Sequence, residues 1–311
     1  MELVHLSSAL PFDEVGPAVT VGNFDGVHRG HQGLVEATVS EARSMGGRAV
    51  VLTFDPHPAR VLAPERAPAP LMTLGQKAEA LAPLGVDVLA VLAFNNEVAG
   101  QSPEEFARTT LAERLHASVV VVGSNFRFGR GREGDLPALR RLGSALGFRV
   151  QEVSPLVHEG EPISSSRIRA ALTRGDVREA RALLGRRFFV DGSVVAGEGR
   201  GRGLGFPTAN LDVVNEALPA SGVYAAWCRT SDGGHAPLPA VANLGRRPTF
   251  QGVEPSVEVH VLDFAADLYG QQLRLEFEEK LRDERRFRGP AALAEQIARD
   301  VEQARGMLAR H

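Results

Sequence analysis

The chain is poor in the residues that several kinds of site require. Its 311 residues include one cysteine, Cys228, and two lysines, Lys77 and Lys280. A single cysteine excludes an intramolecular disulfide and a cysteine-rich zinc site. Neither lysine stands in a GxxxxGK[ST] segment, so a P-loop nucleotide site is excluded as well.

The sequence also has little net charge and no long apolar run. Its formal charge is -3 and is balanced in both halves of the chain, which excludes a basic nucleic-acid-binding arm. No uninterrupted apolar stretch reaches the roughly 20 residues that span a bilayer, and the first residues lack the pattern of a signal peptide. We therefore expect a cytoplasmic protein that uses neither a membrane nor a nucleic acid.

The pattern of apolar and polar residues changes near residue 185. Before that point, apolar β-branched runs alternate with helical periodicity, which is the pattern of βαβ units and a parallel sheet. The sequence SPEEF adds a helix start, with Ser102 as cap and Glu105 completing a capping box. The expected strands of this α/β part are 18–21, 48–54, 86–94, 118–122 and 148–153.

Beyond residue 185, glycine-rich turns separate short strands with alternating polarity, and helical spacing returns at 290–310. This pattern predicts a small antiparallel β-barrel with a C-terminal helix. We place one domain at 1–185 and the other at 186–311, joined by a helical connector at 176–187. The expected strands of the barrel are 188–195, 223–229, 256–264 and 273–277.

The first candidate site is the segment GNFDGVHRGH at 22–31, directly after the first expected strand. A strand that runs through glycine into a helix start presents backbone N–H groups and a positive dipole end to a phosphate. His28 and His31 share one face there, where they can donate hydrogen bonds to an α-phosphate in the transition state. The pattern favours nucleotidyl transfer, although a histidine at a helix start is as often a surface cap.

Two more segments fit the same site. ISSSRIR begins a helix with Ser164 and carries Arg169 one turn later, so hydroxyl, N–H and guanidinium groups converge on an anion. GSNFRFG at 123–129 follows the fourth expected strand, at the carboxyl edge of the sheet. Each segment alone is more typical of a helix cap or a turn. Their occurrence after successive strands of one sheet favours a shared site.

A second candidate site lies in the barrel half. GRGRGLGFPTANL at 199–211 combines glycines that can wrap phosphates with the Thr208 hydroxyl and the Asn210 amide oxygen, which suit Mg²⁺. In SVEVHVLDF at 256–264 the valines alternate with the polar residues Ser256, Glu258 and His260. Glu258 therefore faces away from the valines. It is then either a solvated surface residue or a general base for a substrate hydroxyl.

Several separated motifs together resemble one family. They closely resemble the prokaryotic bifunctional riboflavin kinase and FAD synthetase, in the family's order and over essentially the whole chain. The motifs are GNFDGVHRGH, TFDPHP, GSNFRFG, ISSSRIR, GRGLGFPTANL, NLGRRPTF, SVEVHVLDF, DLYG and LRDERRF.

The resemblance implies a Rossmann-like nucleotidyltransferase domain that adenylates FMN to FAD, followed by a β-barrel that phosphorylates riboflavin to FMN. Both reactions would use ATP and Mg²⁺, and the protein would be a monomer or a weak homo-oligomer. The implied catalytic residues are His28, His31 and Glu258, and the implied Mg²⁺ ligands are Thr208 and Asn210. The implied nucleotide- and flavin-binding residues are Asn23, Asp25, Gly30, Phe54, Asn125, Ser164, Arg169, Gly203, Thr208 and Asn210.

Two other interpretations remain open. HxGH followed by a Ser/Arg cluster is also found in class I aminoacyl-tRNA synthetases, but no lysine-bearing KMSKS-like segment or basic surface accompanies it here. A flavin-responsive regulatory protein with decayed sites is the other alternative. The intact set of Glu258, Thr208, Asn210, His28 and His31 argues against decay.

Overall fold

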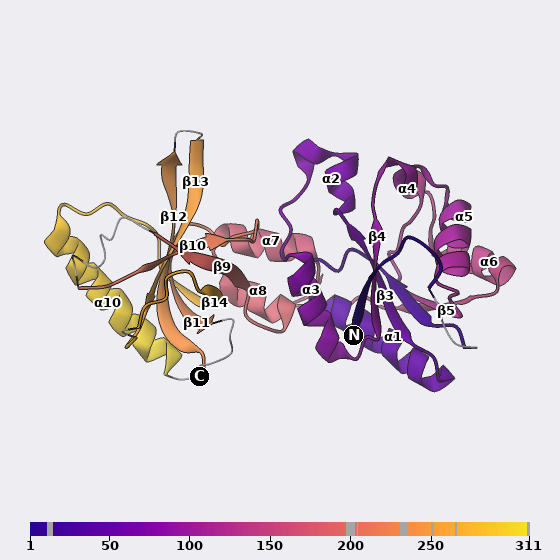
Figure 1. The fold of residues 1–311 in the computed structure, drawn as a ribbon, viewed down its shortest axis with the longest axis horizontal. Helices are drawn as coiled ribbons and strands as arrows, with labels where there is room; N and C mark the ends of the chain where they lie inside the picture. Colours follow the sequence, from indigo (N-terminus) through magenta and orange to yellow (C-terminus); the bar gives the residue numbers. More distant parts are fainter. Residues whose placement is uncertain are drawn as a thin grey trace. The chain divides into compact units, whose positions relative to one another are not determined.

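The computed structural model describes residues 1–10, 15–196, 203, 205–230, 236–249, 252–264 and 266–309. The chain divides into two compact units, Met1–Ser164 and Ser165–His311 (Figure 1). No helix among the described residues is both long enough and apolar enough to cross a membrane.

The first unit is built on a six-stranded parallel sheet in the order β1-β4-β3-β2-β5-β6. Its strands are β1 (Glu2–His5), β2 (Ala18–Val21), β3 (Ala49–Asp55), β4 (Val88–Ala93), β5 (Val119–Gly123) and β6 (Arg149–Val153). The five strands expected from the sequence are confirmed within two residues at either end. β1 is the additional strand, a short and mostly exposed edge strand without a buried run to mark it.

Helices cover both faces of this sheet (Figure 1). One apolar cluster packs α1 (Arg29–Met45) and α3 (Leu74–Leu81) against β3 and β4. Another packs α5 (Pro103–Phe106), η3 (Ala107–Arg114) and α6 (Leu136–Leu146) against the opposite face. The capping box of Ser102 and Glu105 at the start of α5 is confirmed. The helices are α1 (Arg29–Met45), α2 (Pro58–Leu62), α3 (Leu74–Leu81), α4 (Asn96–Gly100), α5 (Pro103–Phe106) and α6 (Leu136–Leu146).

Short elements complete the first unit. They are the π-helical η3 (Ala107–Arg114), the 3₁₀ turns η1 (Pro64–Arg66), η2 (Ala82–Leu84) and η4 (Arg130–Arg132), and a small antiparallel pair of β7 (Val157–His158) with β8 (Glu161–Pro162).

The direction of winding reverses at β2. From β2 the chain adds β3 and then β4 on one side, and afterwards returns to add β5 and β6 on the other side. In an open parallel sheet such a reversal leaves a crevice beyond the carboxyl ends of the two strands concerned, and ligands bind in it. The segments that follow β2 and β5 are the two glycine-containing motifs at 22–31 and 123–129.

The second unit is a closed barrel of six antiparallel strands, in the order β10-β13-β12-β11-β14-β9, and β9 pairs with β10 to close it. The strands are β9 (Phe189–Val195), β10 (Ala209–Val213), β11 (Gly222–Thr230), β12 (Leu238–Thr249), β13 (Gly252–Val261) and β14 (Gln272–Arg282). β10 and β12 are absent from the predicted strands. β12 carries Gly245 and Pro248, and β10 lies inside the motif that was expected to be a phosphate loop.

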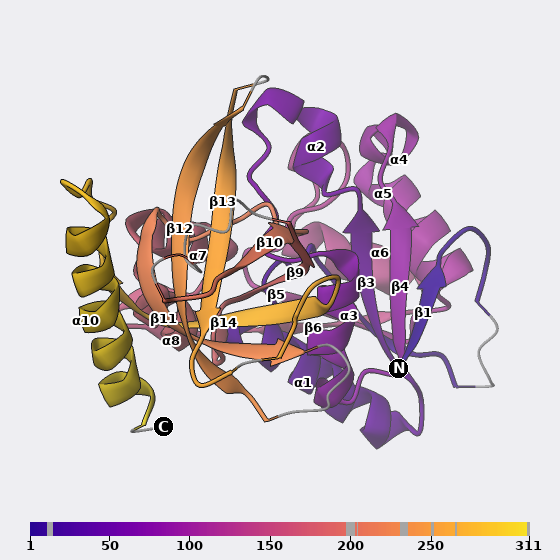
Figure 2. The same cartoon turned by 60° about the vertical axis from the view of Figure 1, so that its left-hand side comes forward.

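Side chains alternate between the interior of the barrel and its outer face, as the pleat of a strand requires. Val257, Val259 and Val261 are buried inside, whereas Ser256, Glu258 and His260 on the other face are partly exposed. Cys228 also lies inside, and burial raises the pKa of its thiol to about 11, so it is unreactive at neutral pH. The expected C-terminal helix is confirmed as α10 (Pro290–Leu308), which packs along β11 and β12 (Figure 2).

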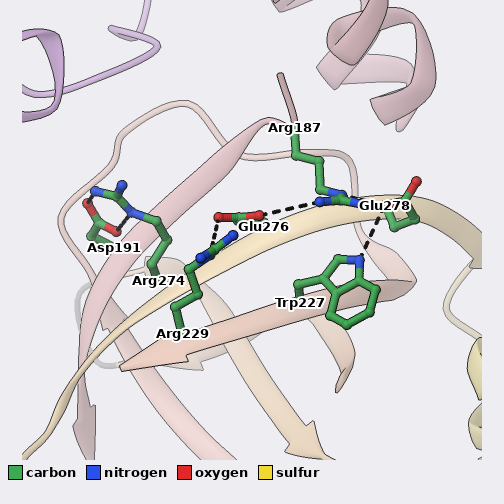
Figure 3. A network of polar contacts seen from close by, with 7 residues as sticks. All are labelled: Arg187, Asp191, Trp227, Arg229, Arg274, Glu276 and Glu278. Atoms are coloured by element: carbon green, nitrogen blue, oxygen red, sulfur yellow. Dashed lines mark hydrogen bonds and ion pairs between the residues drawn. The ribbon is translucent and has the colours of Figure 1, made fainter. Parts of the chain in front are cut away.

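The helix expected within 176–187 is confirmed as α8 (Val177–Leu184), which follows α7 (Ser165–Arg174) and packs on β14. It belongs to the second compact unit. Buried Glu278 of β14 accepts hydrogen bonds from Arg181 of α8, from Arg187 and from the Trp227 indole at 3.4 Å. Figure 3 shows Glu278 with Arg187 and Trp227. Because a buried carboxylate needs partners, these bonds tie the connector to the barrel.

The same outer face of the barrel carries two further ion pairs beside Glu278 (Figure 3). Arg274 pairs with Asp191 through two bonds of 2.7 and 2.8 Å, and Arg229 donates to Glu276 at 2.8 Å. Arg187 lies 3.7 Å from Glu276 as well, so it joins both carboxylates of β14.

Candidate active sites

The loop between β2 and α1 is held in an unusual backbone conformation. Phe24 has φ of 46° and Val27 has φ of 38°, with Gly26 between them at φ 85°. Residues with a Cβ atom rarely adopt this left-handed region, and they keep it only where the surroundings fix them. Phe24 and Val27 are almost completely buried in the cluster that also contains residues of α1 and α3. The packing therefore stabilises a tight turn that leads directly from the strand to the helix.

The loop places His28 and His31 together at the start of α1. His28 is the N-cap, and its Nδ1 accepts a hydrogen bond from the backbone N–H of His31 at 3.2 Å. The two imidazole rings are stacked, with centroids 3.6 Å apart and planes inclined by 16°. The cap interpretation and the paired interpretation of HxGH thus both hold for His28.

The hydrogen bond to Nδ1 fixes which ring nitrogen of His28 carries the proton. Because Nδ1 of His28 accepts, the neutral ring carries its proton on Nε2, which becomes the hydrogen-bond donor. Burial, the neighbouring His28 and then the charge of Lys77 lower the pKa of His31 well below its usual value. Nδ1 of His31 is buried, and no described residue forms a hydrogen bond with it. The imidazole of His31 is therefore neutral at neutral pH.

Gly30 allows close approach at this point. A Cβ atom added to Gly30 would lie 3.2 Å from Cε1 and Nδ1 of His28, which is tighter than ordinary contact. The same position lies 3.7 Å from the carbonyl oxygen of Ile163. The backbone that leads into Ser164 therefore passes beside the start of α1, and the role of Ser164 stays a prediction.

Asn23 and Asp25 are fixed by different partners. Asp25 is buried, and its carboxylate accepts the backbone N–H of Leu71 at 2.9 Å. The side-chain amide of Asn23 lies 3.2 Å from Nε2 of His57, while Nδ1 of His57 accepts the N–H of Ala59 as the N-cap of α2. The contact between the Asn23 amide nitrogen and Nε2 of His57 joins the loop after β2 to the start of α2.

The remaining predicted residues of the first site are more dispersed. Phe54 is half-buried at the end of β3 and meets Phe94 edge to face, with centroids 5.6 Å apart. Asn125 follows β5, which is the strand next to β2, and its side chain is exposed. Arg169 lies in α7, which belongs to the second compact unit, so its relation to His28 stays a prediction. Its neighbour Arg167 is bonded to Glu179 of α8 at 2.8 Å.

In the barrel, the strand register gathers the predicted polar residues into one row. Asn210 of β10 is paired with Glu258 of β13, and Glu258 is paired with Asn243 of β12. Residues directly opposite each other on antiparallel strands share a face, with Cβ atoms about 4.5–5.5 Å apart. The three side chains are partly exposed on the outer face of the barrel. Asn210 and Glu258 are therefore neighbours.

His260 holds the segment that precedes β10. Its Nδ1 lies 2.7 Å from the carbonyl oxygen of Pro207, and its ring meets Phe206 edge to face at 5.7 Å. Because a carbonyl oxygen only accepts, Nδ1 carries the proton. Thr208 follows directly and is half-buried, two positions before Asn210 in the chain. Gly203 is exposed, and most of the glycine-rich stretch, 197–202 and 204, lies outside the described residues.

Four residues near these sites were not predicted. Asn243 lies inside the motif NLGRRPTF, but only the register of β12 shows that it is next to Glu258. His57 lies inside the motif TFDPHP, and its contact with Asn23 joins segments 34 positions apart. Lys77 and Thr53 meet through a hydrogen bond between α3 and β3, which no local pattern indicates. The rarity of lysine was the one available signal for Lys77.

Two family models match successive parts of the chain. The family model described as FAD synthetase matches residues 12–167, and the one described as riboflavin kinase matches residues 184–308. A crystal structure described as that of a macrolide-efflux protein from Streptococcus pneumoniae has a TM-score of 0.88 and 30% identity. It covers 98% of this chain and 99% of that chain.

Curated relatives match over nearly their full length. The bifunctional riboflavin kinase/FMN adenylyltransferase of Escherichia coli (strain K12) is 39% identical over 302 residues, which are 97% of this chain and 95% of that protein. The enzyme of the same name from Pseudomonas fluorescens is 38% identical over 310 residues, 99% of this chain and 98% of the relative. That of Bacillus subtilis (strain 168) is 34% identical and covers 98% and 96%. The chain belongs to the family of bifunctional riboflavin kinase/FMN adenylyltransferases.

Proposed function

We propose that the two activities of the family are divided between the two sites described above. The His28–His31 site transfers the adenylyl group of ATP to FMN, and the Glu258 site transfers the terminal phosphoryl group of ATP to riboflavin. The observation that supports this most strongly is the location of the stacked imidazoles in one compact unit and of the Asn210–Glu258–Asn243 row in the other.

In the kinase reaction, the primary hydroxyl of the riboflavin side chain attacks the γ-phosphorus of ATP. The bond from that phosphorus to the ADP oxygen breaks, and the hydroxyl proton passes to the carboxylate of Glu258 as general base. Placement on a rigid strand between two paired strands suits this role, because a general base must be held within hydrogen-bond distance of the hydroxyl. Asn243, on the other side of Glu258 from Asn210, would orient the carboxylate or the substrate.

In the adenylyl transfer, a phosphate oxygen of FMN attacks the α-phosphorus of ATP and pyrophosphate leaves. No protein nucleophile is needed, so the site must position the two phosphates and stabilise charge in the transition state. The Nε2–H of His28, the N–H groups at the start of α1 and the side chains of Asn23 and Ser164 are the donors for this task. Neutral imidazoles can donate to phosphate oxygens without a prior proton uptake.

A divalent cation fits the barrel site through oxygen donors. Among the described residues, no group of three or more His, Cys, Asp or Glu side chains is placed to hold a metal ion. Mg²⁺ is usually held by one or two protein oxygens together with water and substrate phosphates. The hydroxyl of Thr208 and the amide oxygen of Asn210 are such a pair, and the ion would neutralise the charge of the ATP phosphates.

We also propose several finer features that were predicted from the sequence. The functional boundary at 185/186 is one of them, with Ser164 and Arg169 serving adenylyl transfer. The others are a cytoplasmic location and a monomer or weak homo-oligomer. A nucleotide-consuming enzyme whose one cysteine is a buried thiol is consistent with a reducing compartment.

One assay tests the proposed function directly. The purified chain, incubated with riboflavin, ATP and Mg²⁺, is expected to yield FMN and then FAD, separated by chromatography. Excess EDTA should stop both steps and added Mg²⁺ should restore them, because the phosphates lose their counterion. Absence of any conversion under both oxidising and reducing conditions would favour the regulatory alternative. FMN formation that persists in EDTA would contradict the role of the cation.

A further inference from the structure

Lys77 is a buried cation that the chemistry proposed above does not use. It lies in α3, with 8% of its surface exposed, on a helix that packs into the same apolar cluster as Phe24 and Val27 of the β2–α1 loop. Burial of an ammonium group is costly, and an apolar side chain of similar shape is often as stable or more stable. Only two of the 35 basic residues of the chain are lysines. A structural role alone does not account for a lysine at this position.

The contacts of Lys77 lead to the loop of the adenylyl-transfer site. Its Nζ donates to Oγ1 of buried Thr53 at 3.0 Å, and Oγ1 of Thr53 donates in turn to the backbone carbonyl of Asn23 at 3.1 Å. A hydroxyl has one hydrogen to give and lone pairs to receive, so both bonds can exist at once. The ammonium polarises the hydroxyl and strengthens the bond to Asn23.

Asn23 is consequently held from two directions. Its carbonyl is fixed by Thr53 at the end of the Lys77 relay, and its side-chain amide is fixed by His57. Two residues further along lies Asp25. Burial lowers the pKa of Lys77 below its ordinary value, and the negative charges of Asp25 and Asp55 offset part of this effect. The turn with left-handed Phe24 and Val27 lies between Asn23 and His28. The position of Asn23 therefore determines where the turn delivers the imidazoles.

We propose that Lys77 is a positioning residue for adenylyl transfer, which acts through Thr53 to hold the Asn23–His28 turn. This inference rests on the assignment of His28 and His31 to that reaction. The charge of Lys77 also reaches the site, because it contributes to the lowered pKa of His31, after burial and His28. Lys77 is not proposed to contact phosphate or flavin.

The test compares four variants of the full-length chain. Lys77→Met removes the charge and keeps the volume, Thr53→Val removes the relay and keeps the lysine, and the third variant combines the two. Leu81→Val is the matched control, because Leu81 is a fully buried residue of the same helix with no polar contact. FAD formation from FMN gives kcat and KM, and FMN formation from riboflavin in the same preparation checks the integrity of the other unit.

We expect Lys77→Met to lower kcat for FAD formation by about 30-fold or more with a smaller change in KM, as misplacement of reacting groups does. Thr53→Val should lower it about 10-fold, and the double variant should be no worse than Lys77→Met, since both act through one relay. Leu81→Val and the kinase activity of every variant should stay within about twofold of the unchanged chain. By NMR, the imidazole of His31 should titrate at higher pH in Lys77→Met and should not move in Thr53→Val.

Three results would overturn the proposal. One is FAD formation by Lys77→Met within about threefold of the unchanged chain, and another is an equal loss in Leu81→Val, which would make the role structural. The third is full activity of Thr53→Val, which decides the matter even if Lys77→Met fails to fold. His28→Ala with His31→Ala is measured in parallel: if it keeps FAD formation, the assignment of the site is wrong, which is a separate failure.

Discussion

Replacement of Glu258 by alanine is expected to abolish FMN formation from riboflavin and to leave the conversion of FMN to FAD unchanged. Without the carboxylate, the riboflavin hydroxyl has no base to take its proton while it attacks, and such a loss typically costs about 10²- to 10³-fold in rate. Glu258 lies in the row with Asn210 and Asn243, in the unit that does not contain His28 and His31. Both rates can be measured in one preparation, by supplying riboflavin in one assay and FMN in the other.

Two companion variants make the Glu258 result specific. Glu258→Gln keeps the size and hydrogen bonding of the side chain but cannot accept the proton, so it should be as inactive as the alanine variant. Glu302→Ala removes an exposed glutamate of α10 in the same unit and should have no effect. A folded Glu258→Ala protein that still phosphorylates riboflavin at the normal rate would show that this glutamate is only a solvated surface residue, which is the alternative interpretation of the strand.

Replacement of both His28 and His31 by alanine is expected to have the reverse effect. FAD formation should fall by about 10²-fold or more, because the donors that stabilise the transferring phosphate are gone, while phosphorylation of riboflavin continues. The two rings are replaced together because they stack at 3.6 Å and His28 caps the backbone N–H of His31. FAD formation from supplied FMN is the measurement.

A matched control distinguishes site chemistry from loss of a histidine in general. His5 is exposed on the edge strand β1 of the same unit, and His5→Ala should keep both activities. Since His28 is also an N-cap, its removal destabilises α1 by about 1 kcal/mol, which a thermal unfolding curve will register. Loss of FAD formation together with loss of the kinase activity, in a folded protein, would contradict the separation of the sites.

The sequence predicted the first unit better than the barrel, for a physical reason. The buried strands of a parallel sheet are near-continuous apolar runs such as 119–122, which are easy to locate from composition alone. Strands of a small barrel are solvated on one face and tolerate glycine and proline, so β10 and β12 resembled turns. β10 is also paired with β13, which lies several dozen residues further along the chain, and that information is not local.

The same distinction applies to the sites. His28 and His31 were found because a glycine turn and a helix start bring them together within four residues, and Asn210 was found because its motif is compact. Lys77 became visible only through its bond to Thr53, and Asn243 only through the register with Glu258. Both contacts join distant segments, which single-sequence patterns do not report.

The most direct test of two independent sites is complementation between the two inactive variants. Glu258→Ala alone cannot make FMN, and His28→Ala with His31→Ala alone cannot use it, so neither should convert riboflavin to FAD. An equimolar mixture of the two proteins, with ATP and Mg²⁺, is predicted to restore FAD formation, because FMN released by one protein is the substrate of the other. A mixture of folded proteins that accumulates no FAD, although the unchanged chain does, would contradict the account.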